Sequence, residues 1–117
     1  MLSILKMKLK EVVKNLNLTV LAGRDVLGGE VTGGYASDML SDVLANAGKG
    51  CLWVTMQIHP NVLAVASTKD LSGIIIVNGR KPEAETLEKA ERKKIPILMS
   101  QWSTYTVAGR LYELGIK

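Results

Sequence analysis

Phenylalanine is absent from this chain of 117 residues, and cysteine and histidine occur only once each. A single cysteine excludes an internal disulfide, and it excludes a cysteine-built zinc or iron–sulfur site within one chain. The lone His59 stands beside Pro60 and Asn61, a context that fits a turn better than a catalytic base. Without phenylalanine the hydrophobic core must be aliphatic, built from leucine, isoleucine, valine, alanine and five methionines.

Signals of membrane insertion, export and phosphate-transfer catalysis are missing as well. No apolar run approaches the roughly 20 residues of a membrane span, and Lys6 breaks the apolar start before signal-peptide length. The glycine, lysine and serine/threonine pattern of a P-loop is absent. Asp38 and Asp42 lie one helical turn apart, but they fit a solvent-facing helix surface better than a magnesium site. We therefore expect a cytoplasmic protein without catalytic activity, cofactor or metal.

The positive charge does not gather in a pattern typical of nucleic-acid binding. The formal net charge is +4 at pH 7, yet no zinc-finger, stacking-aromatic or basic-region pattern accompanies it. Solvated helix faces explain these lysines and arginines more simply, so nucleic-acid binding is disfavoured. Apolar residues make up 47% of the chain and charged residues 22%, which is typical of one globular domain. We expect an N-terminal helix at 1–15, followed by an α/β domain at 16–117.

Hydrophobic periodicity predicts an alternation of strands and helices along most of the chain. The predicted helices span residues 3–15, 37–47, 60–71, 82–94 and 103–114, and the predicted strands span 18–22, 30–32, 51–56, 73–77 and 96–99. The run at 62–66 fits a strand as well as a helix, and we favour a helix because it then connects two buried strands. Such alternation indicates an α/β protein with a mainly parallel sheet of about five strands.

A glycine-rich stretch at residues 28–38 stands out in the first half of the chain. Gly33 and Gly34 predict a turn that leads into helix 37–47, with Ser37 as the helix N-cap. A glycine turn before a helix N-terminus is a favourable place to bind an anion. The same residues also suit a tight structural connection, and the spacing alone leaves both interpretations open.

Three short motifs in order resemble the DRTGG domain family. They are Thr32-Gly33-Gly34-Tyr35-Ala36-Ser37-Asp38, Gln57-x-His59-Pro60-Asn61 and Gly73-Ile74-Ile75-Ile76-Val77-Asn78-Gly79. The family is named for Asp-Arg-Thr-Gly-Gly, and here Glu30 and Val31 occupy the first two positions. The resemblance covers roughly residues 16 to 116 and implies a three-layer α/β/α fold, like the N-terminal domain of HPr kinase/phosphorylase. It also implies a regulatory or ligand-sensing module without catalytic activity.

The loops that follow the predicted strands are the candidate ligand site. If the strands are parallel, polar residues after each strand meet at one sheet edge, where open α/β sheets bind ligands. The predicted ligand-binding residues are Thr32, Gly33, Gly34, Tyr35, Ser37, His59, Asn78 and Arg80. We expect a small anionic metabolite or nucleotide, a homodimer, and control of a partner metabolic or redox enzyme. The alternative is a pure dimerisation or protein-interaction domain whose polar edge is only loop chemistry.

Overall fold

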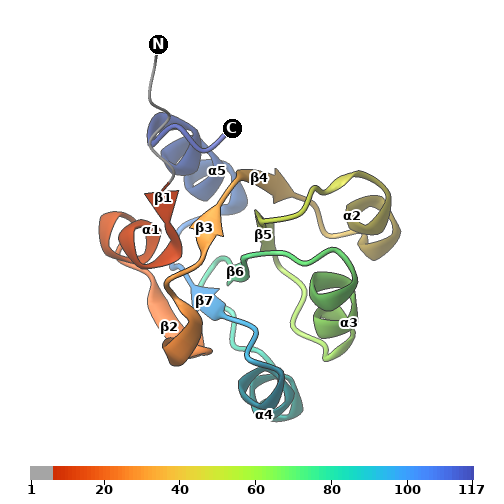
Figure 1. The fold of residues 1–117 in the computed structure, drawn as a ribbon. Helices are drawn as coiled ribbons and strands as arrows, with labels where there is room; N and C mark the ends of the chain where they lie inside the picture. Colours follow the sequence, from red (N-terminus) through yellow and green to blue (C-terminus); the bar gives the residue numbers. More distant parts are fainter. Residues whose placement is uncertain (1–6) are drawn as a thin grey trace.

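The computed structural model describes residues 7–117 (Figure 1). The elements in chain order are β1 (Met7–Lys8), α1 (Leu9–Asn15), β2 (Thr19–Ala22), the 3-10 helix η1 (Arg24–Val26), β3 (Glu30–Val31), β4 (Gly33–Ala36), α2 (Leu40–Asn46), β5 (Cys51–Thr55), α3 (Asn61–Thr68), β6 (Gly73–Ile76), α4 (Ala84–Lys93), β7 (Ile97–Met99) and α5 (Thr104–Glu113). The predicted start of the first helix at residue 3 lies outside the described residues. Within them, Met7 and Lys8 form a short strand rather than helix, and α1 begins at Leu9.

A five-stranded sheet in the order β2-β7-β6-β5-β4 forms the middle of the molecule. The strands β4, β5, β6 and β7 are parallel, and β2 pairs with β7 in the antiparallel sense. The side chains of Ile74, Ile75 and Ile76 in β6 are fully buried, as expected for an inner strand covered on both faces. The strands β1 and β3 form a separate antiparallel pair. The predicted mainly parallel sheet is confirmed.

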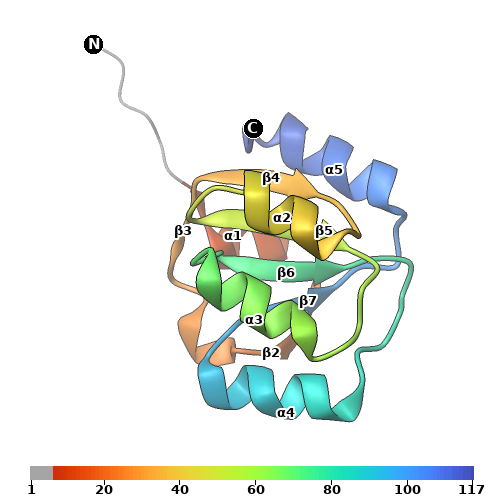
Figure 2. The ribbon, with the colours of Figure 1, turned by 90° about the vertical axis from the view of Figure 1, so that its right-hand side faces the viewer.

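Helices cover both faces of this sheet (Figures 1 and 2). On one face α2, α3 and α4 contribute to a core with Trp53, Ile74 and Ile76. On the other face α1 and α5 contribute to a second core with Leu52, Val54 and Ile75. Successive residues of the inner strands therefore enter opposite cores, as expected because side chains of a β-strand alternate between the two faces of the sheet. The expected three-layer α/β/α architecture is confirmed, and among the described residues no helix is long and apolar enough to cross a membrane.

The segment at 60–71, for which the sequence favoured a helix over a strand, contains the helix α3 at Asn61–Thr68. Val62, Leu63, Val65 and Ala66 are buried against the sheet, and this spacing of one, two and one residues suits a helical face. Two local contacts stabilise the later helices. The Ser103 hydroxyl accepts from the backbone N–H of Thr106 at the start of α5, and Lys89 pairs with Glu85 at 2.9 Å in α4.

The prediction of a glycine turn at residues 33–34 is wrong. Gly33 and Gly34 belong to β4, which pairs in register with β5, so that Gly33 lies opposite Cys51. Neither glycine has a positive φ. The chain end packs over this strand, since the Ile116 side chain lies 3.7 Å from the position of a Cβ on Gly34, an ordinary van der Waals distance. Helix α2 begins at Leu40 instead of residue 37, because residues 37–39 connect β4 to the helix.

Candidate functional site

The four parallel strands end at one edge of the sheet, and α2, α3, α4 and α5 begin at this carboxyl edge (Figure 2). The residues that form the edge include Ser37, Asp38, Met56, Gln57, His59, Asn78, Arg80, Ser100 and Trp102. Helix N-termini carry partial positive charge and free backbone N–H groups. Their convergence on one edge favours negatively charged groups in that region.

Asp38 joins the first two loops of the carboxyl edge. Its Oδ1 accepts from the Thr55 hydroxyl at 2.9 Å and from the Met56 backbone N–H at 2.7 Å. In return, the Gln57 side-chain amide donates to the Asp38 carbonyl oxygen at 2.8 Å. Thr55 is fully buried, so this carboxylate satisfies a hydroxyl that has little access to water. Sequence reasoning placed Asp38 on a solvent-facing helix surface and missed this connection, which depends on a contact between residues distant in the sequence.

The loop after β6 joins the loops on either side of it. The Arg80 guanidinium donates to the Met56 carbonyl oxygen. The backbone N–H groups of Asn78 and Gly79 donate to the carbonyl oxygens of Trp102 and Ser100, each at 2.8 Å. Asn78 and Gly79 both adopt left-handed backbone conformations, with φ of 59° and 63°. Together with Asp38, these contacts hold all four loops in one hydrogen-bonded arrangement.

The predicted site residues do not form one cluster. Ser37, His59, Asn78 and Arg80 lie at the carboxyl edge, as predicted from the parallel sheet. Thr32 lies at the opposite edge, where its hydroxyl donates to the Lys49 carbonyl oxygen at 2.6 Å. Gly33 also lies at that end of β4, since it pairs with the first residue of β5, and Gly34 follows it within the strand.

Tyr35 points toward α2 rather than into a ligand site. Its hydroxyl donates to Asp42 Oδ1 at 2.8 Å, and the Asn46 amide donates to the same oxygen at 2.9 Å. The carboxylates of Asp38 and Asp42 therefore accept hydrogen bonds from different donors: Thr55 and Met56 for Asp38, Tyr35 and Asn46 for Asp42. Among the residues that the structure describes, no group of three histidine, cysteine, aspartate or glutamate side chains could hold a metal ion.

The Tyr35–Asp42 contact predicts a measurable pH effect. The side chains of Ser37, Tyr35 and Asn46 lower the pKa of Asp42 below its ordinary value, and the hydrogen bond to Asp42 raises the pKa of Tyr35. A depressed carboxyl pKa contributes stability above the unfolded value, about pH 4, and loses it as the pH falls through the folded value. In Tyr35→Phe we expect the pKa of Asp42 to rise toward its ordinary value, measured by carboxyl-carbon NMR titration.

A suitable control is Tyr105→Phe, because Tyr105 is 89% exposed and belongs to α5, which covers the opposite face of the sheet from α2. That substitution should leave the pKa of Asp42 unchanged. An equal Asp42 pKa in the wild type and in Tyr35→Phe would contradict the hydrogen bond as a cause of the shift.

Two hollows of the surface do not include the predicted site residues of the carboxyl edge. One of about 630 Å³ follows the outer face of α5. Another of about 470 Å³ lies at the opposite sheet edge, where Thr32, Lys49 and Ser72 contribute to its walls. Neither contains His59, Asn78 or Arg80. The candidate ligand site is therefore an open surface of loops and helix N-termini, separate from these hollows.

The fold is similar to that of a solved structure, the CBS and DRTGG domains of the regulatory region of Clostridium perfringens pyrophosphatase, complexed with the activator diadenosine tetraphosphate. The TM-score is 0.66 at 14% sequence identity, and the match covers 89% of this chain and 45% of the other. The chain thus spans less than half of that regulatory region. At this identity the likeness concerns the fold alone. A comparison with curated protein sequences found no match.

The sequence pattern of the DRTGG domain matches residues 11–114, which is most of the chain. The matched range runs from α1 to the end of α5, so it includes both faces of the sheet and the carboxyl edge. The resemblance carried by the Thr-Gly-Gly, Gln-x-His-Pro-Asn and Asn-Gly motifs is confirmed by this match. The chain belongs to the DRTGG domain family.

Proposed function

We propose that this chain is a non-catalytic regulatory domain that binds a small anionic metabolite or nucleotide at the carboxyl edge of its sheet. The observation that supports this most directly is that four helices begin where four parallel strands end. Such an edge is the usual ligand position of open α/β sheets, and helix N-termini favour anions. The solved regulatory region with the similar fold was complexed with a nucleotide activator, which is consistent with this proposal.

The groups proposed to contact the ligand are Ser37, His59, Asn78 and Arg80. Among the described residues, Arg80 donates only to the Met56 carbonyl, which leaves further guanidinium N–H groups for phosphate oxygens. His59 Nδ1 accepts from the Asn61 N–H, so its Nε2 is available to donate to a ligand. His59, Asn78 and Arg80 are exposed. Thr32, Gly33, Gly34 and Tyr35 are not included, because their contacts lie within β4 or away from this edge.

The absence of catalytic activity is part of the proposal. The single histidine is engaged with Asn61, and a nucleophilic mechanism would need a base oriented by a third group. We further propose that residues 7–117 act as one domain, since α1 contributes Leu9, Val12 and Leu16 to the core shared with α5. This domain would act in the cytoplasm as a homodimer and control a partner metabolic or redox enzyme.

Arg80→Ala is the variant that tests the ligand site. Titration of the wild type with inorganic phosphate, ATP and diadenosine tetraphosphate should raise the melting temperature for at least one of them, because a ligand that binds the folded state stabilises it. Arg80→Ala should raise the dissociation constant of that ligand at least about tenfold, the effect of removing one charged hydrogen-bonding partner. Trp102 reports the same event by fluorescence, since its carbonyl oxygen accepts from Asn78 at this edge.

Arg24→Ala is the matched control. Arg24 is also exposed and also donates one guanidinium hydrogen bond to a backbone carbonyl, that of Val20 at 3.0 Å, but it lies beside β2, away from the carboxyl edge. Its removal should leave anion binding unchanged. If none of the three anions changes the melting temperature or the fluorescence, the ligand-sensing proposal fails, and the interaction-domain alternative replaces it.

A further inference from the structure

The outer face of α5 has no partner among the described elements, although its inner face is buried. Val107 and Leu111 are buried against the sheet, whereas Tyr105 is 89% exposed and Tyr112 is 61% exposed. Gly109 lies between them, and a Cβ placed on it would meet no atom within 4 Å. The hollow of about 630 Å³ follows this face. Two large exposed rings on either side of a glycine form a concave helical surface.

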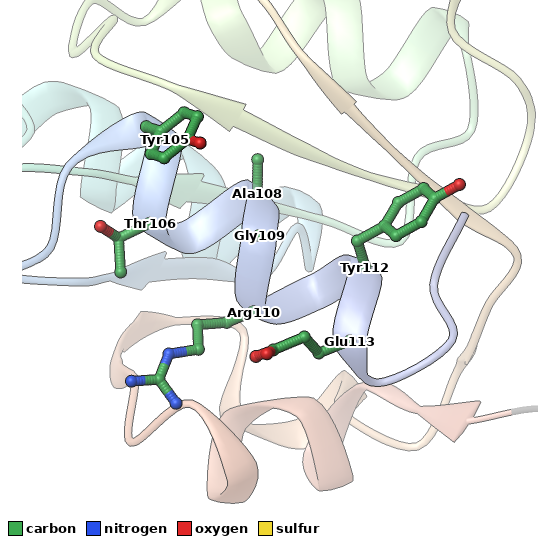
Figure 3. A pocket seen from close by; sticks show the side chains of 7 residues that line it. All are labelled: Tyr105, Thr106, Ala108, Gly109, Arg110, Tyr112 and Glu113. Carbon is green, nitrogen blue, oxygen red and sulfur yellow. The ribbon is translucent and has the colours of Figure 1, made fainter.

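The two flanks of this surface differ in chemistry. Figure 3 shows Tyr105, Ala108 and Tyr112 on one side of α5, and Arg110 and Glu113 pointing to the other side. The charged flank therefore carries one positive and one negative side chain, on a chain whose formal net charge is +4. The Arg110 guanidinium lies 5.0 Å from the centre of the Trp102 ring. On the other flank, the Lys117 ammonium lies 4.9 Å from the centre of the Tyr112 ring. The opposite charges available to pair between two copies are therefore those of Arg110 and Glu113.

We infer that a second copy of this chain packs on this surface, with the two α5 helices antiparallel about a two-fold axis. The inference rests on the self-association part of the proposed function and is independent of the anionic ligand. The midpoint between Tyr105 and Tyr112 falls between Ala108 and Gly109. At a rise of about 1.5 Å per residue the rings lie about 5 Å on either side of that midpoint. The two-fold operation thus places Tyr105 opposite Tyr112 of the second copy, around two small residues.

The same operation pairs the charged flanks. Arg110 and Glu113 of the second copy lie about 9 Å apart along the helix axes. Side chains tilt toward the N-terminus of their own helix, so in an antiparallel pair these two lean toward each other. A parallel pair would instead set the tyrosine flank against the charged flank. Charge complementarity and ring spacing therefore favour the antiparallel arrangement.

The edge strand β4 provides a further reason to cover this side of the molecule. It has a neighbour, β5, on one side only. Ala108 and Tyr112 of α5 share a smaller hollow, of about 230 Å³, with Gly34, Tyr35 and Ala36 of this strand. Exposed strand edges invite non-specific pairing and are usually covered. A second copy seated on the tyrosine flank would shield the free edge.

Gly109→Arg is the main test, by sedimentation velocity from about 10 to about 200 µM, a range in which weak dimers are populated. The wild type should dimerise within this range, and Gly109→Arg should raise the dissociation constant at least about tenfold. Its melting temperature, measured at a concentration where the protein is monomeric, should not fall, because the added side chain meets open space. Ala64→Arg, at an exposed position of α3, is the matched control and should dimerise like the wild type.

A charge exchange tests the orientation and the identity of the partner. Glu113→Arg should weaken the dimer, and Arg110→Glu combined with Glu113→Arg should restore it. A wild type that stays monomeric throughout overturns the inference, and so does a dimer that Gly109→Arg leaves intact. If Glu113→Arg weakens the dimer and the double variant does not restore it, the antiparallel pairing is overturned. Phosphate, ATP and diadenosine tetraphosphate titrations of Gly109→Arg report separately on the carboxyl edge, so failure of either proposal is distinguishable.

Discussion

Replacing Trp53 with alanine is expected to lower the free energy of unfolding by about 3–5 kcal/mol, the range for deleting a large buried aromatic side chain. Trp53 is fully buried in β5, within the core that faces α2, α3 and α4. Its indole N–H also donates to the Ser37 carbonyl oxygen at 2.8 Å. Because single domains of this size are stable by only about 5–15 kcal/mol, a large part of the stability should be lost. Urea unfolding at 25 °C, followed by far-UV circular dichroism, measures the change.

Trp53→Phe separates the two contributions of this residue. Phenylalanine keeps a ring in the core but cannot donate to Ser37, so the loss should be smaller than for alanine. The loop of residues 37–39 should then exchange its amide protons faster, because its connection to β5 through the indole is gone. A cost below about 1 kcal/mol for Trp53→Ala would contradict the packing described for this core.

The parts of the fold that the sequence predicts are those with a strong local pattern. The strand at residues 73–77 is purely apolar, and such a run has little alternative to a buried strand. The last helix shows helical spacing of Val107 and Leu111, with Ser103 as its N-cap. The sheet edge that gathers His59, Asn78 and Arg80 follows from the same alternation of strands and helices. Each of these features can be predicted without knowing which distant segments touch.

The glycine pair could not be predicted in this way, because glycine has no side chain to show a period of two residues. Its strand conformation depends on pairing with Cys51 and Leu52, and on the chain end that packs above it at Ile116. The same error placed Thr32 in one predicted site with Ser37. An extended chain advances about 3.3 Å per residue, so the five steps from Thr32 to Ser37 span about 16 Å. A turn would have kept both hydroxyls in one site, whereas the strand separates them.

The Thr-Gly-Gly part of the family motif therefore has a structural explanation in this chain. The Thr32 hydroxyl donates to the Lys49 carbonyl oxygen at the edge opposite the carboxyl edge. Gly33 and Gly34 lie within β4, where they pair with Cys51 and Leu52 of β5. The residue that matters most for the loop arrangement, Asp38, lies outside those three positions. Its contacts with Thr55 and Met56 connect the segment after β4 to the end of β5, so they depend on the pairing of these two strands.

Asp38→Ala is expected to lower the free energy of unfolding by about 2–3 kcal/mol, since hydrogen bonds to a charged group contribute about 1.5–3 kcal/mol each and this group is partly solvated. The buried Thr55 hydroxyl and the Met56 N–H would both lose their acceptor. Asp38→Asn keeps an oxygen at the same position, so it should cost less than half as much. Urea unfolding of the two variants and the wild type at pH 7 measures the difference.

The same pair of variants separates stability from ligand binding at the carboxyl edge. Asp38 is the carboxylate that joins the loops preceding α2 and α3, so it opposes an anion bound there. Removing its charge in Asp38→Asn should tighten the binding of phosphate or nucleotide, while the protein becomes less stable. Calorimetric titration at low ionic strength gives the affinity, and the effect should shrink at high salt because exposed charges are screened. Weaker anion binding in Asp38→Asn, in a protein that still unfolds cooperatively, would mean that the ligand does not approach this edge as proposed.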